Sequence, residues 1–393
     1  MSSLFQVAHA THPDWRAALA LACAQLPTHF PTELPPSSSP GAALGFVYLT
    51  DHFSAQAEAL LLALQDRWPA VAWVGAVGIG VCANGVEYFD EPGLVLMLGT
   101  LPAEQFEVFS GAKPLARIKP FSALVHADAA THDLDELILE MSQRTESHYL
   151  FGGLASSRQG GFHIADGIWR GGLSGVAFSA DVALVSRVTQ GCQPTGMQRR
   201  VTKAERNVVV ELDGLPALGC LLSDLGIANL DNPRAVMPRL QATLVGLSGA
   251  NDLLFERGGQ FGADTKVRHL IGLDPARQAL AVADVVEPGM RLAFCQRDMH
   301  AARRDLVRIC SEIRDELAPV DDTAPVTKRI LGAHYVSCTG RGGPHFGGPS
   351  AELKIIQHAL GDVPLAGFFA AGEITRHHLV GYTGVLTVFV GDL

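Results

Sequence analysis

The stretch ILGAHYVSCTGRGGPHFGG, residues 330–348, and the stretch PLAGFFAAGEITRHH, residues 364–378, decide the predicted fold. The first opens with an apolar run, Ile330 to Ser337, which we predict to be a strand. Glycine and proline then follow at a density that no helix tolerates, so a polar loop must end this strand. The second stretch opens with a buried strand, Pro364 to Phe369, and also runs into a polar loop. Each strand therefore ends in a loop that carries charged side chains.

A helix is predicted between these two strands, because apolar residues recur from Ser350 onward at helical spacing. The hydroxyl of Ser350 is placed to cap the N-terminus of this helix. After the second loop, Gly381 and Tyr382 turn the chain into a last apolar run, Thr383 to Val390. The whole stretch is thus one β-α-β-β unit. The apolar face of its helix consists of Leu353, Ile356 and Leu360.

The same order of elements occurs twice earlier in the chain, from Leu44 to Leu98 and from Phe121 to Phe178. In the second copy the apolar face of the helix consists of Leu134, Leu137, Ile138 and Met141. Glycines follow the second strand of both copies and are predicted to form loops: Gly75, Gly78 and Gly80, then Gly152 and Gly153. Three similar units indicate an α/β protein built by repetition. The alternative is that any α/β chain shows this alternation.

The length of 393 residues exceeds one average core and predicts two domains. The composition changes near Gly214 from strands to helix-like segments, so we place the boundary there. Residues 1–214 then form the first domain and residues 215–393 the second. In the second domain, three strands between His269 and Cys295 precede a long helix that Asp298 can cap. We therefore predict a two-domain α/β protein built from repeated β-α-β-β units with mixed sheets.

Composition and charge argue against several classes of protein. The formal net charge of -10 and the pI near 5.8 disfavour a nucleic-acid-binding surface. No basic residue precedes Arg16 and no apolar run is long enough for a signal core or a membrane span, so we expect a cytoplasmic protein. The 7 cysteines are scattered and include no C-x-x-C pair, which is typical of reduced thiols.

A family resemblance rests on short motifs in a fixed order along nearly the whole chain. The motif residues are Gly75, Gly78, Gly152, Gly153, Gln190, Gly191, Cys192, Pro194, Leu215, Pro216, Ala217, Cys338, Arg341, Gly342, Gly372, Glu373, Gly381, Tyr382 and Thr383. Each motif is weak alone, but their order and spacing together are fairly specific. The chain resembles FIST proteins, in which an N-terminal FIST domain precedes a FIST C-terminal domain.

The resemblance implies a sensory, ligand-binding module of bacterial signalling that binds small molecules such as amino acids. Such modules are sometimes fused or linked to histidine kinases or to cyclic-di-nucleotide enzymes. One branch of the family resembles haem-binding nitric-oxide sensors. Since this chain ends at Leu393 with no room for an output domain, we expect it to signal through a separate kinase or cyclic-di-nucleotide partner.

The two loops near the end of the chain suit a zwitterionic ligand. Arg341 presents a fork of donors that matches a carboxylate, while Glu373 can receive an ammonium group. Ligands of open α/β sheets favour the carboxyl ends of strands, where both residues lie. The alternative is that Arg341 and Glu373 pair with each other and only hold the loops together. The predicted ligand-binding residues are Arg341, Gly342, Cys338, Gly372, Glu373, Tyr382, Thr383, Gly152, Gly153, Gly191 and Cys192.

Two further functional classes stay open. A haem sensor would need an axial ligand, for which His345, His378 and His163 are the candidates, with the thiols of Cys192 and Cys338 as others. No C-x-x-C-H motif is present, so covalent attachment of haem is excluded. A protein-interaction scaffold is the other class. Phosphate-loop and nucleophile-elbow motifs are also missing, so we predict no catalytic residue, and a buried, inert thiol is expected for Cys338.

Overall fold

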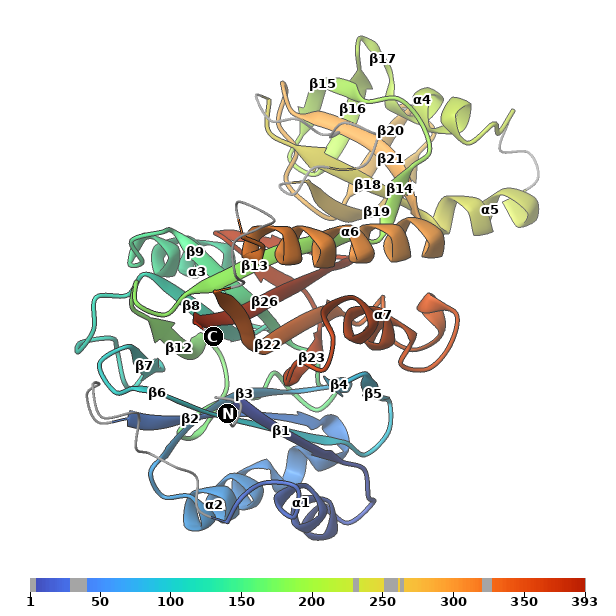
Figure 1. Ribbon diagram of the computed structural model, residues 1–393. Helices are drawn as coiled ribbons and strands as arrows, with labels where there is room; N and C mark the ends of the chain where they lie inside the picture. Colours follow the sequence, from blue (N-terminus) through green and yellow to red (C-terminus); the bar gives the residue numbers. More distant parts are fainter. Residues whose placement is uncertain are drawn as a thin grey trace. The chain divides into compact units, whose positions relative to one another are not determined.

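The computed structural model describes residues 5–28, 41–228, 233–250, 261, 265–319 and 327–392. The proline- and serine-rich stretch from Pro31 to Gly41, which its composition predicts to be a connector, lies outside this set except for Gly41, which belongs to a strand. The chain forms two compact units (Figure 1). Unit 1 consists of Met1–Thr189, Arg303–Leu379 and Thr383–Leu393, and unit 2 of Gln190–Ala302 and Val380–Tyr382.

Unit 1 contains the three predicted β-α-β-β units. The first is β2 (Gly41–Thr50), α2 (Ala57–Arg67), β3 (Val71–Gly78) and β6 (Leu94–Pro102); the second is β8 (Ser122–Asp128), α3 (Leu134–Gln143), β9 (Tyr149–Ala155) and β12 (Leu173–Phe178); the third is β22 (Lys328–Cys338), α7 (Ala351–Leu360), β23 (Leu365–Ala370) and β26 (Thr383–Asp392). In each, the first strand pairs in parallel with the second and antiparallel with the last. The prediction of mixed sheets from repeated units is confirmed.

In each β-α-β-β repeat a hairpin follows the second strand and joins the sheet of another repeat. The hairpins are β4 (Gly80–Ala83) with β5 (Val86–Phe89), β10 (His163–Ala165) with β11 (Ile168–Trp169), and β24 (Glu373–Thr375) with β25 (His378–Val380). The first hairpin pairs with β23, the second with β3 and the third with β9. This cyclic exchange was not predicted. Because of this exchange, each sheet contains strands from two repeats. The three repeats therefore fold together.

The three sheets of unit 1 have the same strand order. They read β1-β6-β2-β3-β10-β11, β7-β12-β8-β9-β24-β25 and β13-β26-β22-β23-β4-β5. The first strand in each of these orders is an edge strand: β1 (Phe5–Ala10), β7 (Phe106–Phe109) or β13 (Leu184–Gln190). A shared core takes Phe46 from the first sheet, Phe151 from the second and Phe368 from the third. Burying one phenylalanine side chain contributes about 1.5–3 kcal/mol to the free energy of unfolding. Because all three sheets bury side chains in this core, the stability of each sheet depends on the other two.

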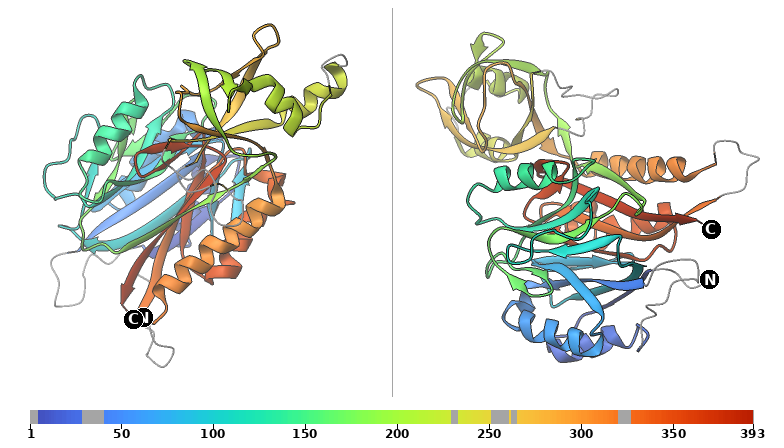
Figure 2. Two further views of the ribbon diagram at one scale, coloured as in Figure 1. Left: turned by 90° about the horizontal axis from the view of Figure 1, so that it is seen from above. Right: turned by 90° about the vertical axis from the view of Figure 1, so that its left-hand side faces the viewer.

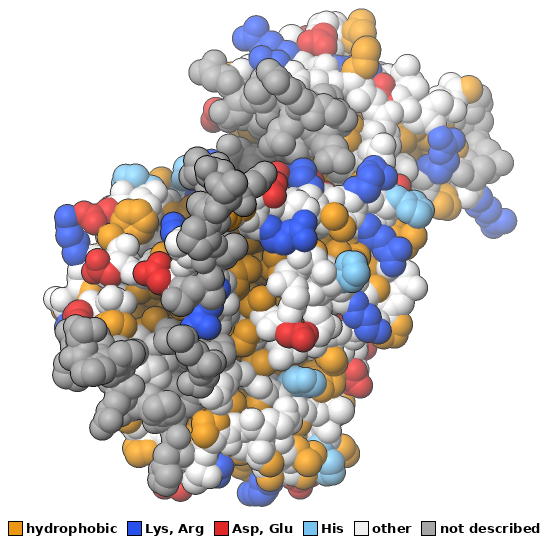
Figure 3. Space-filling view, viewed as in Figure 1, with side chains coloured by type: hydrophobic (Ala, Val, Ile, Leu, Met, Phe, Trp, Pro, Cys, Tyr) orange, Lys and Arg blue, Asp and Glu red, His pale blue; other side chains and the backbone are white. Residues whose placement is uncertain are grey.

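A second hydrophobic layer lies on the outer face of the first sheet, which α1 (Trp15–Cys23) and α2 cover (Figures 1 and 2). In the space-filling view, charged side chains are spread over the visible face of unit 1 with hydrophobic ones between them (Figure 3).

In each repeat, the second strand contains a glycine that close packing requires. A Cβ atom at Gly75 or Gly367 would lie 1.7 Å from the carbonyl oxygen of the neighbouring parallel strand, and at Gly152 it would lie 1.9 Å away. The three glycines therefore occupy equivalent positions in the three repeats. The prediction that Gly75 and Gly152 open loops is wrong, because β3 and β9 continue through them.

Unit 2 is an antiparallel sheet that closes on itself. Its strands are β14 (Cys192–Pro194), β15 (Arg199–Glu205), β16 (Val208–Leu212), β17 (Leu215–Pro216), β18 (Thr243–Ser248), β19 (Lys266–Asp274), β20 (Ala279–Val282) and β21 (Arg291–Arg297), and its helices are α4 (Ala217–Asp224) and α5 (Pro233–Gln241). Pairing of β18 with β21 closes the path β21-β15-β16-β20-β19-β18 into a barrel, seen nearly end-on in Figure 2. The sequence predicted the last three strands but missed β15 and β18.

The compact units are not consecutive along the chain. The predicted boundary at Gly214 lies inside unit 2, between β16 and β17. The third repeat follows unit 2 in sequence yet shares the core of the first two, because hairpin exchange ties it to them. The long helix α6 (Met299–Leu317) begins in unit 2 and continues in unit 1, with Asp298 accepting from the amide of Ala301 as predicted.

Candidate functional site

Arg341 is held by a carboxylate that the sequence reading missed. It lies just beyond β22, and its side chain is 1% exposed. Its Nε and Nη2 donate to Oε1 of Glu352 at 2.9 and 2.7 Å. Tyr335 donates to the same oxygen at 2.7 Å, and Ser337 donates to Oε2 at 3.0 Å. Glu352 therefore has four donors around it, and the pair is enclosed in the third repeat.

The alternative prediction that Arg341 pairs with Glu373 is wrong, since Glu352 is its partner. A signal for this partner was present in the sequence. Glu352 stands beside Leu353 and one helical turn before Ile356, so it lies on the face of α7 that was predicted to be buried. A buried carboxylate on such a face needs a cationic partner, and Arg341 is the nearest arginine or lysine that precedes Glu352 in sequence.

Ser350 does not cap α7, contrary to prediction. It adopts a left-handed backbone with φ of 59° and makes no side-chain cap hydrogen bond. Instead its Oγ accepts from the amide of Glu87 at 3.0 Å, and its own amide donates to Oε1 of Glu87 at 2.8 Å. Burial raises the pKa of Glu87 to about 7, although the bonds from Ser350 and Gly343 oppose this. The hairpin from the first repeat thus fixes the start of α7.

Glu373, the first residue of β24, is completely buried. Its Oε2 accepts from the amide and the hydroxyl of Thr383 at 3.1 and 2.6 Å. Burial raises the pKa of Glu373 to about 8, while the bonds from Thr383, the charge of Arg341 and the thiol of Cys338 act to lower it. At neutral pH the carboxyl is therefore largely protonated.

Two atoms of this region have unused hydrogen-bonding capacity. Among the described residues, neither Nη1 of Arg341 nor Oε1 of Glu373 has a hydrogen-bond partner, and both are buried. Arg341 and Cys338 lie close enough to Glu373 to influence its pKa, so these residues form one group. We call Arg341, Glu352, Cys338, Glu373 and Thr383 the charged cluster. Because buried polar atoms are almost always paired, these two atoms mark a place for a ligand or water.

The predicted glycines of unit 1 pack the strands around this cluster. A Cβ at Gly342 would meet the rings of Phe89 and Phe369, and one at Gly372 would meet leucine side chains. Gly153 stands opposite Glu373 in the pairing of β9 with β24, and Gly152 stands opposite the next residue. These glycines therefore position Glu373.

Three predicted ligand-binding residues, Gly191, Cys192 and Tyr382, belong to unit 2. The amide of Gly191 donates to the carbonyl of Tyr382 at 3.1 Å, and the hydroxyl of Tyr382 lies 2.6 Å from Nε2 of His269. Cys192 is buried in a hydrophobic cluster that includes Cys295. The structure therefore groups these three residues within unit 2, and the remaining predicted ligand-binding residues within unit 1.

The three histidines considered for haem lie on separate elements. His163 on β10 uses both ring nitrogens, with Nδ1 2.5 Å from Oγ of Ser174 and Nε2 3.1 Å from the carbonyl of Gly171. His345 packs its ring against Phe346, and His378 packs against His377. No histidine lines the pockets of about 180 to 270 Å³ that described residues of unit 1 form. None of the three candidate histidines therefore lines one of these three pockets.

A buried polar triad lies in the shared core of unit 1 and was not predicted. The hydroxyl of Tyr48 lies 3.0 Å from Nε2 of His126 and also contacts Nε2 of His334. Burial lowers the pKa of His334 to about 3 and that of His126 well below its ordinary value, so both rings are neutral. Neither Nδ1 atom has a partner among the described residues. A single hydroxyl proton cannot satisfy both rings, so one ring must donate to Tyr48 and the other accept.

Other types of site were sought in the same residues. The described part of the chain contains no group of three or more His, Cys, Asp or Glu side chains arranged to hold a metal ion. None of its helices is both long and apolar enough to span a membrane. All seven cysteines are buried free thiols, as expected for Cys338.

These features define an α/β protein with unused binding capacity in a buried charged cluster. The FIST N domain model matches residues 43–215, and the FIST C domain model matches residues 217–376. The chain is 31% identical to an uncharacterized protein of Mycobacterium tuberculosis, over 97% of this chain and 98% of the relative. It is 29% identical to an uncharacterized protein of Mycobacterium bovis, over 98% of both. The chain belongs to the FIST family, whose domains are sensory domains of signal transduction.

Proposed function

We propose that this chain is a non-catalytic sensory protein whose charged cluster binds a small zwitterion of the amino-acid class. The observation that carries the proposal is the pair of unused buried atoms, Nη1 of Arg341 and Oε1 of Glu373. One is a cationic donor and the other a carboxyl oxygen that becomes an acceptor when Glu373 ionises, which is then the complement of a carboxylate and an ammonium group. Glu352 keeps Arg341 in place and leaves that one nitrogen for the ligand.

Binding would change the protonation of Glu373. Without ligand, burial holds its pKa at about 8, so the carboxyl carries a proton at neutral pH. A ligand ammonium beside Oε1 favours the ionised carboxylate, because an opposite charge lowers the pKa of an acid. Binding at pH 7 would therefore release a proton. Affinity would rise with pH toward about 8, until the amino group of the ligand itself begins to lose its proton.

The route from ligand to output would run through Thr383. The oxygen of Glu373 that does not face the ligand holds the amide and hydroxyl of Thr383. Thr383 is bonded to Tyr382, which belongs to unit 2 and accepts from the amide of Gly191. Ionising Glu373 strengthens its bonds to Thr383, so the ligand favours one conformation of this crossing segment. A cytoplasmic histidine kinase or cyclic-di-nucleotide enzyme would detect that conformation.

A thermal-shift screen of the proteinogenic amino acids, followed by calorimetric titration of those that stabilise the chain, tests the proposal. In Glu373→Gln the side chain still accepts from Thr383 but places an amide donor or a neutral oxygen at the ligand. We expect at least a tenfold loss of affinity. Arg341→Lys keeps the charge beside Glu352 but removes Nη1, and we expect a similar loss. Unchanged affinity in both variants would place the site elsewhere.

Glu107→Gln is the matched control for these variants. Glu107 is a buried carboxylate of unit 1 that accepts from the amides of Arg117 and Ile118 at 2.8 and 3.2 Å. The change removes a buried charge outside the charged cluster. We expect it to lower stability while leaving amino-acid affinity within twofold of the wild-type value.

The haem alternative has a direct readout in the absorbance spectrum. We expect the purified chain, with and without added haem, to show no Soret band that shifts with nitric oxide. The reason is that His163 uses both ring nitrogens and that no described pocket contains a histidine. A band that shifts with nitric oxide would replace the amino-acid proposal with a gas sensor.

A further inference from the structure

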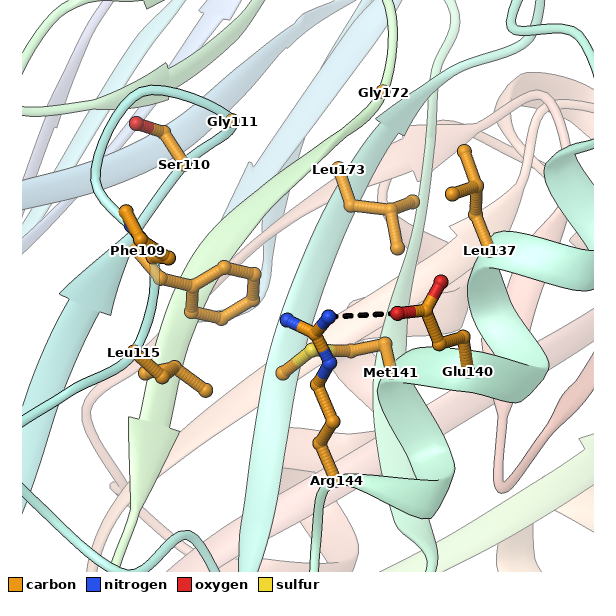
Figure 4. Close-up of a pocket in the computed structure, with 11 residues that line it drawn as sticks. Phe109, Ser110, Gly111, Leu115, Leu137, Glu140, Met141, Arg144, Gly172 and Leu173 are labelled. Atoms are coloured by element: carbon orange, nitrogen blue, oxygen red, sulfur yellow. Dashed lines mark hydrogen bonds and ion pairs between the residues drawn. The ribbon is translucent and has the colours of Figure 1, made fainter.

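A second site lies on the outer side of the second sheet of unit 1. It is a pocket of about 270 Å³ between the end of β7 with its following loop, helix α3 and the start of β12 (Figure 4). Its walls are mainly hydrophobic, and none of its residues belongs to the charged cluster. The hydrophobic walls consist of Phe109, Pro114, Leu115, Leu137, Met141 and Leu173.

Helix α3 explains why the pocket is apolar. Its predicted apolar face included Leu137, Ile138 and Met141. Ile138 and Met141 are buried against the second sheet, but Leu137 remains partly exposed because it faces the pocket. The described part of the chain thus covers only a part of this face. Burying this exposed apolar wall is favourable, so the pocket is suited to a ligand with an apolar body.

The charged rim of the pocket points to the head group of that ligand. Arg144 lies across the opening, between Leu115 and Glu140, in Figure 4. Its Nη2 donates to Oε1 of Glu140 at 2.6 Å, and both side chains are 57% exposed. Exposed ion pairs of this kind contribute little, so Glu140 is readily exchanged for another anion. Among the described residues, Arg144 makes no other side-chain hydrogen bond, which leaves donors for a carboxylate.

We propose that this pocket binds a small aromatic or branched aliphatic carboxylate. The apolar body would lie against Leu137, Met141 and Leu173, and the carboxylate would accept from Arg144. The size follows from the volume, since an apolar cavity of about 150 Å³ holds a benzene ring, and about 270 Å³ also admits a short side chain. An anion is favoured over a cation because the guanidinium of Arg144 projects between Leu115 and Glu140, whereas the Glu140 carboxylate lies beside α3 (Figure 4).

The probes are 3-phenylpropionate and its neutral counterpart 3-phenylpropanol, titrated into the full chain and followed by ligand-observed NMR and calorimetry. We expect 3-phenylpropionate to bind at millimolar concentration or tighter, and 3-phenylpropanol to bind at least tenfold more weakly. Arg144→Gln should weaken 3-phenylpropionate at least tenfold and change 3-phenylpropanol less than twofold. Leu137→Trp, which fills the pocket from an exposed helix face, should abolish binding of both probes.

Arg314→Gln is the matched control, because Arg314 is also an exposed arginine and lies in the last turn of another helix, α6. It should leave both affinities unchanged. The proposal is overturned if neither probe binds at ten millimolar, if the two probes bind equally, or if Arg144→Gln binds 3-phenylpropionate as well as the wild type does. Glu373→Gln should bind both probes normally, so failure here and failure of the amino-acid proposal are distinguishable.

Discussion

Two buried carboxyl groups of the third repeat, Glu352 and Glu373, have opposite roles. Glu352 receives four hydrogen bonds, from Arg341, Tyr335 and Ser337, so both of its oxygens have partners. Glu373 receives two hydrogen bonds from Thr383 and keeps one oxygen without a partner among the described residues. A saturated carboxylate holds the fold, whereas an unsaturated one is where binding energy can be gained. The predictions that follow test this difference.

The largest effect is expected for Glu352→Ala. It leaves the guanidinium of Arg341 buried without a counter-ion, and breaking such a pair costs about 3–5 kcal/mol. The free energy of unfolding of unit 1, measured with denaturant, should fall by that amount. A loss below about 1 kcal/mol would show that Glu352 is not the structural partner of Arg341.

The pH dependence of stability should distinguish Glu373 from Glu352. The pKa of Glu373 rises on folding from an ordinary value of 4.5 to about 8, so the folded state binds a proton that the unfolded state has lost. Its contribution to stability is complete below pH 4.5, decreases as pH rises, and is lost above about pH 8. Glu373→Gln should flatten this slope, measured as the midpoint of thermal unfolding against pH. Glu87, whose pKa is raised to about 7, contributes a slope of the same sign that remains in the variant. An unchanged slope in the variant would contradict the raised pKa.

The smallest effect is expected for a surface ion pair of the same chemical type. Nη2 of Arg187 donates to Oε2 of Glu316 at 2.5 Å, and the two side chains are 32% and 46% exposed. Glu316→Ala should change the free energy of unfolding by about 1 kcal/mol or less, because solvent screens such pairs. The Glu316→Ala variant removes the carboxylate of an exposed ion pair, whereas Glu352→Ala removes that of a buried one. A loss comparable to that of Glu352→Ala would mean that burial does not separate the two pairs.

Much of the fold could be predicted from sequence because it depends on local patterns. Apolar residues at helical spacing and short apolar runs located the three repeats, and Arg341 and Glu373 lie near strand ends of one repeat as predicted. Their burial was not predicted. The exchange of hairpins could not be predicted, since pairing of Glu373 with Gly153 depends on contacts far apart in the sequence. The barrel of unit 2 was missed for the same reason.

The members of the charged cluster were predicted in part. Residue chemistry identified the guanidinium and the carboxyl group, but the partner of each depends on packing. The role of Glu352 was not predicted, because the burial of a single carboxylate on an apolar helix face depends on its tertiary partners. The triad of Tyr48, His126 and His334 gave no local signal, since each residue stands alone within an apolar strand.

Proton release on binding tests the central claim most directly. The amino acid that stabilises the chain most strongly would be titrated calorimetrically at pH 7 in two buffers of different ionisation enthalpy. The account predicts that close to one proton is released to the buffer, because the ligand ammonium ionises Glu373, and that none is released in Glu373→Gln. A binding enthalpy that is independent of the buffer in the wild type would contradict it, since Glu373 would then not be the group that receives the ligand.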